Sequence, residues 1–326
     1  MDDQIQVSII CNVYNHGEYI RDALEGFVMQ KTDFPFEVLV HDDASTDDSA
    51  KIIREYEERY PDIIKPIYQT VNQYSQRKGI TRTFQRPRAR GNYVAMCEGD
   101  DCWTDPLKLQ KQFDFLESHP EYSMCVCSTV WHNVATNIRE SRGAIAADTD
   151  IQTEDLILEK NGRIFQYATV FLRMDVWKDE PAWFRCFPIG DYPLALNAAI
   201  HGKIRMLAEE MAIYRYGTKN SWTVRMDDDA KRIRVCERMI EGLNAFNEAT
   251  NRRYNEPVTA RINRHKYTMA LMKHDLKTLQ SGELGEMFRA RPLKYRISDV
   301  IRCKFPALYN AIGRPLAKVM KSHERS

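Results

Sequence analysis

The feature that most constrains the fold is an alternation of short apolar runs with helix-like segments through residues 5–130. Phe36–Val40 is a nearly continuous apolar run, which is typical of a strand buried on both faces. Glu18–Met29 instead repeats its apolar side chains every three to four residues, as an amphipathic helix does. This alternation predicts an α/β fold with a doubly wound, mostly parallel sheet and helices on both faces.

Further elements follow from the same patterns. A helix is expected after Ser45, where Ser45 and Asp48 have the spacing of a capping box, and another from Asp105-Pro106, with the aspartate as N-cap. The remaining strands of this region are expected at Ile5–Cys11, Ile64–Tyr68, Asn92–Cys97 and Met124–Val130.

The chain changes character twice after residue 130. Residues 131–225 mix strand and helix patterns, whereas residues 226–326 are mainly helical in pattern. We therefore predict one domain at 1–225, made of halves at about 5–130 and about 131–225. A helical C-terminal region with a basic tail is predicted at 226–326.

Composition excludes several classes of protein. The net charge of +1 gives no argument for nucleic-acid binding, and the 43% apolar content is that of a globular chain. The eight cysteines form no CxxC pair, which leaves a zinc knuckle unsupported and favours a reducing, cytoplasmic location. We expect neither a signal peptide nor a membrane span, because the N-terminus is acidic and no apolar run is long enough.

Two acidic clusters follow predicted strands. Glu98-Gly99-Asp100-Asp101 places three carboxylates together, which favours a bound divalent cation, although a solvated turn that caps the next helix has the same pattern. Asp42-Asp43 could bind a ribose hydroxyl or a base N–H, or could cap the helix that follows. Ligands bind at the carboxyl ends of strands in such sheets, so both clusters stand where a site is expected.

The sequence has no glycine-rich phosphate loop. Neither GxGxxG nor GxxxxGK[ST] occurs, so the charge of a bound diphosphate would have to be offset in another way, and a metal at Asp100 would serve. Asp191 stands at the start of a predicted helix, where it is either a helix cap or a general base for an acceptor hydroxyl.

Taken together, these segments resemble the family 2 glycosyltransferases, which have the GT-A fold. The likeness covers roughly residues 5–220 and depends on the order and spacing of four segments. They are Val7–Asn15, Asp42–Asp47, Glu98–Asp101 with Trp103–Pro106, and Gly190-Asp191.

The resemblance implies a role for each position. Asp100 would coordinate Mn²⁺ or Mg²⁺ on the donor diphosphate, with Asp101 supporting the site, and Asp191 would be the base of an inverting displacement. The residues implied in contacts with the donor nucleoside are Asn12, Tyr14, Asp42, Asp43 and Glu98.

The sequence departs from the family pattern at three places. Glu98 stands where the metal-binding segment usually begins with aspartate, and Gly190 replaces an acid before the expected base. The late segment Tyr214–Gly217 lacks the histidine that members often carry. Arg215 within it would help to hold phosphate.

The resemblance also implies partners. The donor would be a nucleotide-diphosphate sugar, with UDP as the usual nucleotide. The acceptor would be a glycan or a lipid-linked glycan in surface-polysaccharide assembly. Residues 289–326 carry ten Lys or Arg against two Asp or Glu, interleaved with apolar residues. This tail would either lie on an anionic membrane, which would make the protein peripheral at the inner face, or form a solvated helical cap.

Three other functions remain open from the sequence. A catalytically silent scaffold that binds a nucleotide-sugar would fit Gly190 and the missing histidine. A nucleotidyltransferase also places carboxylates and metal at strand ends, but the turn at Asn12–Gly17 lacks its basic, glycine-rich character. A glycosidase would need two carboxylates about 5–10 Å apart and fits this sheet poorly.

Overall fold

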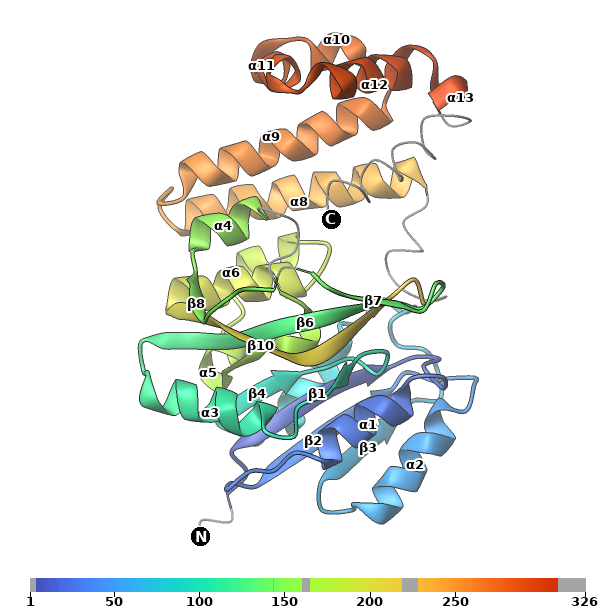
Figure 1. Cartoon of the computed structure of the whole chain (residues 1–326), viewed down its shortest axis with the longest axis vertical. Coiled ribbons are helices and arrows are strands. Elements are labelled where there is room, and N and C mark those ends of the chain that lie inside the picture. Colours follow the sequence, from blue (N-terminus) through green and yellow to red (C-terminus); the bar gives the residue numbers. More distant parts are fainter. Residues whose placement is uncertain (1–3, 143, 160–164, 219–227, 310–326) are drawn as a thin grey trace. The chain divides into compact units, whose positions relative to one another are not determined.

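The computed structural model describes residues 4–142, 144–159, 165–218 and 228–309 (Figure 1). The chain divides into two compact units, one made of Met1–Pro181 with Ile189–Arg225 and the other of Ala182–Pro188 with Met226–Ser326. The short segment Ala182–Pro188 therefore belongs with the helical unit, although it lies within the predicted domain at 1–225.

The first unit is built on one mixed sheet. Its strand order is β3-β2-β1-β4-β9-β6-β10-β5, with β7 paired to β6 and β8 paired to β10. The strands are β1 Val7–Val13, β2 Phe36–Asp42, β3 Ile64–Tyr68, β4 Tyr93–Met96, β5 Cys102–Trp103, β6 Tyr122–Asn133, β7 Ile138–Ser141, β8 Thr149–Ile151, β9 Phe171–Arg173 and β10 Lys203–Tyr216.

The predicted α/β fold class is confirmed, and the parallel part of the sheet is localised. Strands β3, β2, β1 and β4 are all parallel, with Val7 opposite both Phe36 and Tyr93. The short β9 runs antiparallel to both β4 and β6, and β6 is parallel to β10. The sheet is thus parallel where strands alternate with helices and mixed beyond β4.

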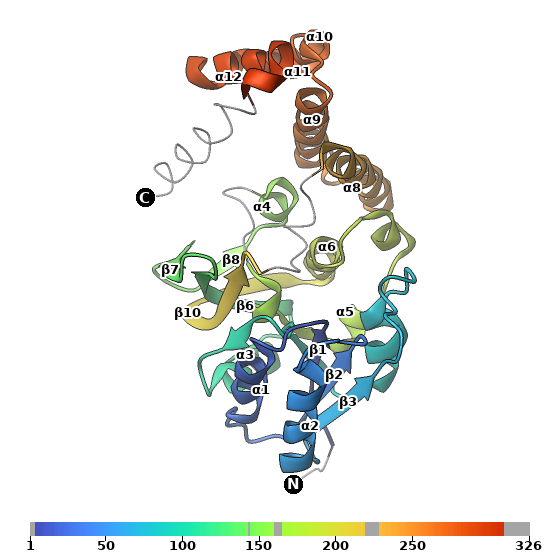
Figure 2. The same ribbon diagram turned by 90° about the vertical axis from the view of Figure 1, so that its right-hand side faces the viewer.

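The main core lies between β1 and the helices α1 Ile20–Val28, α2 Ser49–Arg59 and α3 Lys108–Ser118. Val7, Ile9 and Cys11 point to this core, while Ile10 is equally buried on the opposite face. Figure 2 shows α1 and α3 on one side of the sheet and α5 Met174–Lys178 on the other. Burial on both faces explains why the strands read as continuous apolar runs.

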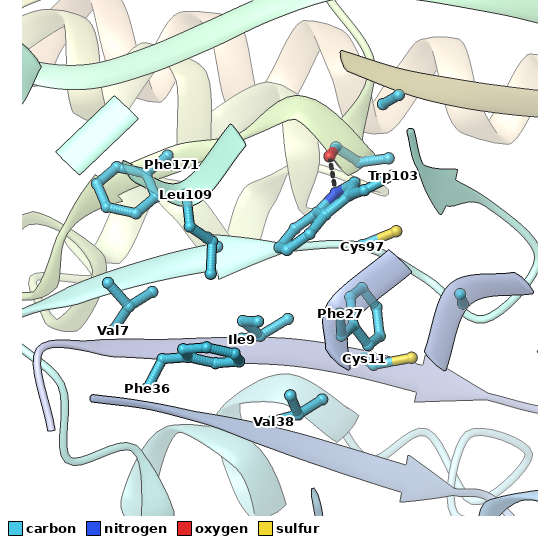
Figure 3. Packing of buried hydrophobic residues seen from close by; sticks show 14 of the residues in the cluster. Val7, Ile9, Cys11, Phe27, Phe36, Val38, Cys97, Trp103, Leu109 and Phe171 are labelled. Carbon is cyan, nitrogen blue, oxygen red and sulfur yellow. Dashed lines mark hydrogen bonds between the residues drawn. The ribbon is translucent and has the colours of Figure 1, made fainter. Parts of the chain in front are cut away.

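Trp103 ties the core to the mixed part of the sheet. Its ring meets Phe27 of α1 edge-on, with 5.0 Å between centroids, and its indole nitrogen donates to the Ala168 carbonyl at 2.7 Å (Figure 3). A buried indole N–H requires such an acceptor. The segment that follows the acidic cluster at 98–101 is therefore firmly anchored.

Two helix starts differ from the sequence-based expectation. Helix α2 begins at Ser49 and its N-cap, Asp48, makes no side-chain capping bond, so the predicted capping box is wrong. Ser45 instead accepts a hydrogen bond from the backbone of Asn15. Helix α3 begins at Lys108, because Asp105 accepts from the Leu107 amide and fixes a turn before the helix.

The described residues of the first unit also contain three short η turns and three further α-helices. The loop between β3 and β4 carries a π-helical turn, η1, and a 3₁₀ turn, η2, and the rest lie between β8 and β10. Their bounds are η1 Thr81–Gln85, η2 Arg86–Arg88, α4 Thr153–Leu158, η3 Tyr167–Thr169, α5 as above and α6 Asp191–His201.

The second unit is helical. Phe246 of α8 packs between Trp183 of η4 and Tyr254, with ring centroids 5.1 and 5.8 Å away. No helix among the described residues is long and apolar enough to cross a membrane. The elements of this unit are η4 Ala182–Cys186, α8 Asp229–Ala249, α9 Asn255–Met272, α10 Leu276–Leu279, α11 Gly282–Ala290, α12 Leu293–Lys304 and α13 Pro306–Leu308.

Candidate active site

The candidate site lies where the parallel strands end. The Asp43 amide donates to the Val13 carbonyl at 2.9 Å, and the Gly99 amide donates to the Asn12 carbonyl at 3.1 Å. The two acidic clusters therefore flank the turn after β1 on either side. This is the arrangement predicted from the strand ends.

Asp42 and Asp43 have different surroundings. Asp42 is 2% exposed, and burial raises the pKa of its carboxyl above the usual value. Its Oδ2 accepts from the Ser45 amide at 3.4 Å, whereas Oδ1 has no hydrogen-bond partner among the described residues. Asp42 therefore keeps acceptor capacity for a ligand hydroxyl or N–H.

Asp43 has a structural task. Its two carboxylate oxygens accept from the backbone amides of Gln73 at 2.7 Å and Tyr74 at 3.0 Å. These bonds fix the loop that follows β3 against the end of β2. A contact between Asp43 and the donor nucleoside stays a prediction, and the carboxylate would have to make it in addition to these bonds.

The side chain of Asn12 is held by the segment between β3 and β4. It donates to Thr81 Oγ1 at 3.1 Å and accepts from Gln85 at 3.5 Å. Gln85 also donates to the main-chain carbonyls of Cys11 and Leu39, at 3.2 and 2.8 Å. Tyr14, two residues further along the turn, is half-buried.

The three carboxylate side chains at 98–101 differ in how far they are buried. Glu98 is exposed, the side chain of Asp100 is 17% exposed, and Asp101 is buried. Burial, followed by the neighbouring Asp100 carboxylate, raises the pKa of Asp101 well above its usual value. Asp101 Oδ1 accepts from the Arg215 amide at 2.8 Å, so this carboxyl anchors the cluster to β10.

The Arg215 guanidinium joins three parts of the unit. It pairs with the carboxylate of Asp22 on α1 and donates to the Asp100 carbonyl at 3.0 Å. Its side chain is 7% exposed and lies over the Tyr19 ring. The contact with phosphate that we predicted stays a prediction, since these partners already engage the guanidinium.

Asp191 begins α6, and its Oδ1 accepts from the Tyr192 amide at 2.8 Å. It lines a small, mostly apolar pocket together with Tyr167 and Tyr192. Burial raises the pKa of the Tyr167 phenol, and the carboxylates of Glu98 and Asp191 add to the effect. Tyr167 thus lies within electrostatic reach of both carboxylates, and its hydroxyl is 3.0 Å from the Met96 sulfur at the end of β4.

The carboxylates fit an open metal site. Among the described residues, no group of three or more His, Cys, Asp or Glu side chains could hold a metal ion by itself. Asp100 offers a partly exposed carboxylate, with Glu98 two residues before it. Mg²⁺ and Mn²⁺ accept one or two carboxylates when substrate phosphates and water supply the other ligands, so the residues present fit such an ion.

Sequence reasoning missed four residues at this site: His16, Asp22, Gln85 and Tyr167. Each of them lies near a predicted site residue that is distant in the sequence. His16 lies near Asp100, Asp22 pairs with Arg215, Gln85 bonds Asn12, and Tyr167 is within electrostatic reach of Glu98 and Asp191. His16 lies inside the turn that the sequence already marked, so it could have been considered. The other three carry no local signal, because only the fold brings their partners near.

The comparison with known families shows to which family this chain belongs. A model of the family described as glycosyl transferase family 2 matches residues 8–179, more than half of the chain. The chain belongs to glycosyl transferase family 2.

Relatives of this family 2 member include an uncharacterized protein of Mycobacterium tuberculosis, which is 39% identical over 220 residues. That match covers 66% of this chain and 60% of the relative's length. TuaG of Bacillus subtilis, provisionally named as a teichuronic acid biosynthesis glycosyltransferase, is 33% identical over 110 residues, or 34% of this chain and 41% of TuaG.

Two solved structures share the fold of this family 2 member. Staphylococcus aureus TarS in complex with UDP-GlcNAc has a TM-score of 0.56 at 18% identity, covering 92% of this chain and 89% of that one. The mannosyltransferase PcManGT of Pyrobaculum calidifontis, in complex with GDP-Man and Mn²⁺, has a TM-score of 0.54 at 16% identity, covering 95% and 88%. Such low identities establish the fold alone.

Proposed function

We propose that this chain transfers a sugar from a nucleotide-diphosphate sugar, a UDP-sugar, to an acceptor hydroxyl with inversion at the anomeric carbon. One observation carries the proposal. Asp42 and Asp100 follow β2 and β4 on either side of the β1 turn, and Tyr167, which shares a pocket with Asp191, lies within electrostatic reach of both Glu98 and Asp191. Nucleotide-sugar donors in the two similar structures support the substrate class.

The residues have distinct tasks in this reaction. Asp42 accepts a hydrogen bond from the nucleoside, and Asp100, with Glu98 nearby, holds Mn²⁺ or Mg²⁺. The ion would stabilise charge on the leaving nucleoside diphosphate. Asp191 takes the proton of the acceptor hydroxyl, and the mostly apolar pocket that Tyr167 and Tyr192 line limits attack by water.

A thermal-shift experiment tests the donor assignment. We expect UDP to raise the melting temperature in the presence of Mn²⁺, because a ligand that binds only the native state stabilises it. Asp100→Asn removes a charged metal ligand and is expected to abolish the Mn²⁺-dependent part of the shift. GDP and other nucleoside diphosphates serve as comparisons for the base. Absence of any shift with every nucleotide would contradict the proposal.

Catalysis requires a separate measurement, since a silent scaffold would give the same thermal shift. We expect Mn²⁺-dependent release of nucleoside diphosphate from the donor, which a scaffold would not show. Gly190 before the expected base is the observation that favours the scaffold. Release of nucleoside diphosphate by the unmodified chain would exclude it.

We further propose a glycan or lipid-linked acceptor in surface-polysaccharide assembly, at the cytoplasmic face of an anionic membrane. The eight cysteines are free thiols, which suits a reducing compartment. Leu293, Ile297 and Phe305 are 66%, 50% and 57% exposed, and Lys294 and Lys304 beside them are exposed as well. An apolar strip flanked by cations matches an anionic lipid surface. Residues 310–326 of the predicted tail lie outside the described residues.

A further inference from the structure

The turn that carries His16 is fixed by the segment before α2. The amides of Asn15 and His16 donate to the hydroxyls of Ser45 and Ser49, both at 2.9 Å. The Gly17 amide donates to the Asp47 carboxylate at 2.8 Å. Three consecutive amides are thus held by one segment, so the position of the His16 side chain is well determined before any ligand arrives.

His16 faces the metal-binding cluster. Its Nε2 is 4.0 Å from Asp100 Oδ2, which is too long for a hydrogen bond between the two atoms. The ring packs directly over Gly99, where an added Cβ would lie 2.9 Å from His16 Nδ1. The absence of a side chain at residue 99 therefore allows the imidazole to approach the acidic cluster.

The surroundings of the ring select its tautomer. His16 Nδ1 is buried and has no hydrogen-bond partner among the described residues. Either tautomer leaves Nδ1 without a partner among these residues, but Nε2 faces the Asp100 carboxylate, whose negative charge favours the proton of the neutral ring on Nε2. A protonated Nε2 cannot coordinate a metal, but it can donate a hydrogen bond toward Asp100.

The gap between His16 and Asp100 suits one oxygen atom. An oxygen about 2.8 Å from each of two atoms 4.0 Å apart makes an angle of about 90° between them, which hydrogen-bond and metal-ligand geometry both allow. An anionic oxygen there would be repelled by Asp100 alone, but not by Asp100 together with a divalent cation.

We propose that His16 binds the donor diphosphate, with its Nε2–H donating to a phosphate oxygen that also faces the metal at Asp100. This inference rests on the proposed function and adds a residue to its donor site. His16 thereby supplies a hydrogen-bond donor at an edge where Arg215 is already engaged by Asp22 and the Asp100 carbonyl.

Titration calorimetry of UDP and of uridine, each with Mn²⁺, tests the proposal. We expect His16→Phe to weaken UDP binding about tenfold or more, because a hydrogen bond to a charged oxygen is lost. Uridine, which has no phosphate, should bind both proteins equally. His16→Gln, whose amide can donate from a similar place, should recover much of the UDP affinity.

Further variants separate the possible causes of a loss. His119→Phe is the matched control, because His119 is the C-cap of α3 and its Nδ1 lies 2.8 Å from the Phe115 carbonyl of the same helix. Gly99→Ala, which would displace the ring, should weaken UDP binding as His16→Phe does. Melting temperatures and circular dichroism verify that each variant is folded.

Two results would overturn the proposal. The first is unchanged UDP binding by His16→Phe while the unmodified chain binds UDP, which would leave the proposed function intact. The second is a loss of Mn²⁺ binding by His16→Phe without nucleotide, measured by electron paramagnetic resonance, because His16 would then be a metal ligand. Failure of the unmodified chain to bind any nucleoside diphosphate would instead remove the proposed function and this inference together.

Discussion

At the residue scale, the two adjacent aspartates at the end of β2 have different tasks, because their side chains meet different partners. Asp42 keeps an unpartnered oxygen at the site, while Asp43 uses both oxygens to hold the amides of Gln73 and Tyr74. The sequence indicated that both are acidic and follow a strand. It could not separate their tasks, because the partners of Asp43 lie thirty residues further on and form no pattern of their own.

The same limit applies to Arg215. Its residue type suits phosphate binding, but no pattern in the sequence indicates that Asp22 on α1 pairs with it. The acidic cluster at 98–101 was easier to predict, because its three carboxylates are adjacent in the sequence and their repulsion is a local property. Local electrostatics can thus be predicted, whereas partners brought together by the fold cannot.

Asp191→Asn tests the general base. We expect turnover to fall by about 10²- to 10⁴-fold, the usual contribution of a positioned base, while UDP affinity stays the same. The amide oxygen of asparagine can still accept from the Tyr192 amide, so the start of α6 should be preserved. Steady-state kinetics and calorimetry give the two quantities.

Asp175→Asn is the matched control for that substitution. Asp175 stands in the first turn of α5, and its Oδ1 accepts from the Val176 amide at 2.8 Å, as Asp191 does from Tyr192. Turnover should be unchanged in this variant. Normal turnover by Asp191→Asn would show that another group removes the acceptor proton.

At the scale of elements, the strands and helices of the first 130 residues could be predicted because each has a clear period. The strand at Ile64–Tyr68 has the predicted bounds, and the helix starts at Ser49 and Lys108 were shifted by turn bonds that compete with capping. Beyond β4 the sheet is mixed, and its antiparallel β9 has only three residues. So short a strand has too little length for a period to show.

Arg215→Met tests the contact between β10 and the acidic cluster. It removes a buried cation that donates to the Asp100 carbonyl and pairs with Asp22, and we expect a loss of stability on the order of 1–3 kcal/mol. Denaturant unfolding measures this loss. UDP affinity with Mn²⁺ should also fall, because Asp100 loses a bond that orients its backbone.

Arg21→Met is the control for that experiment. Arg21 pairs with Glu55 between α1 and α2, and both side chains are nearly half exposed, so the substitution should cost much less stability than Arg215→Met. If the two variants lost the same stability, the Arg215 contacts would contribute no more than a surface ion pair.

At the scale of the whole molecule, the exposed strip on the second unit predicts lipid binding. We expect sedimentation with vesicles that contain phosphatidylglycerol and little with phosphatidylcholine alone, and added salt should weaken the binding. Leu293→Ser with Ile297→Ser should reduce the binding about tenfold, because two exposed apolar side chains no longer enter the lipid surface.

Ile138→Ser on β7 is the matched control for lipid binding. Ile138 is 53% exposed and lies in the first unit, so its loss should leave vesicle binding unchanged. Equal binding to neutral and anionic vesicles would contradict the role of the basic residues. A change in oligomeric state in the Leu293→Ser, Ile297→Ser variant, measured by light scattering, would show that the strip joins copies of the chain instead.

The hydrogen bond from the Arg215 amide to Asp101 bears on how much of the chain an independently folding fragment must contain. The family match ends at residue 179, before β10 begins at Lys203. Yet β10 fills the place between β6 and β5, and its Arg215 amide holds Asp101. A fragment trimmed to the matched segment would retain the acidic cluster but leave β5, β6 and β8 without the strand with which all three pair, so an independently folding fragment that keeps the proposed site must extend through Tyr216.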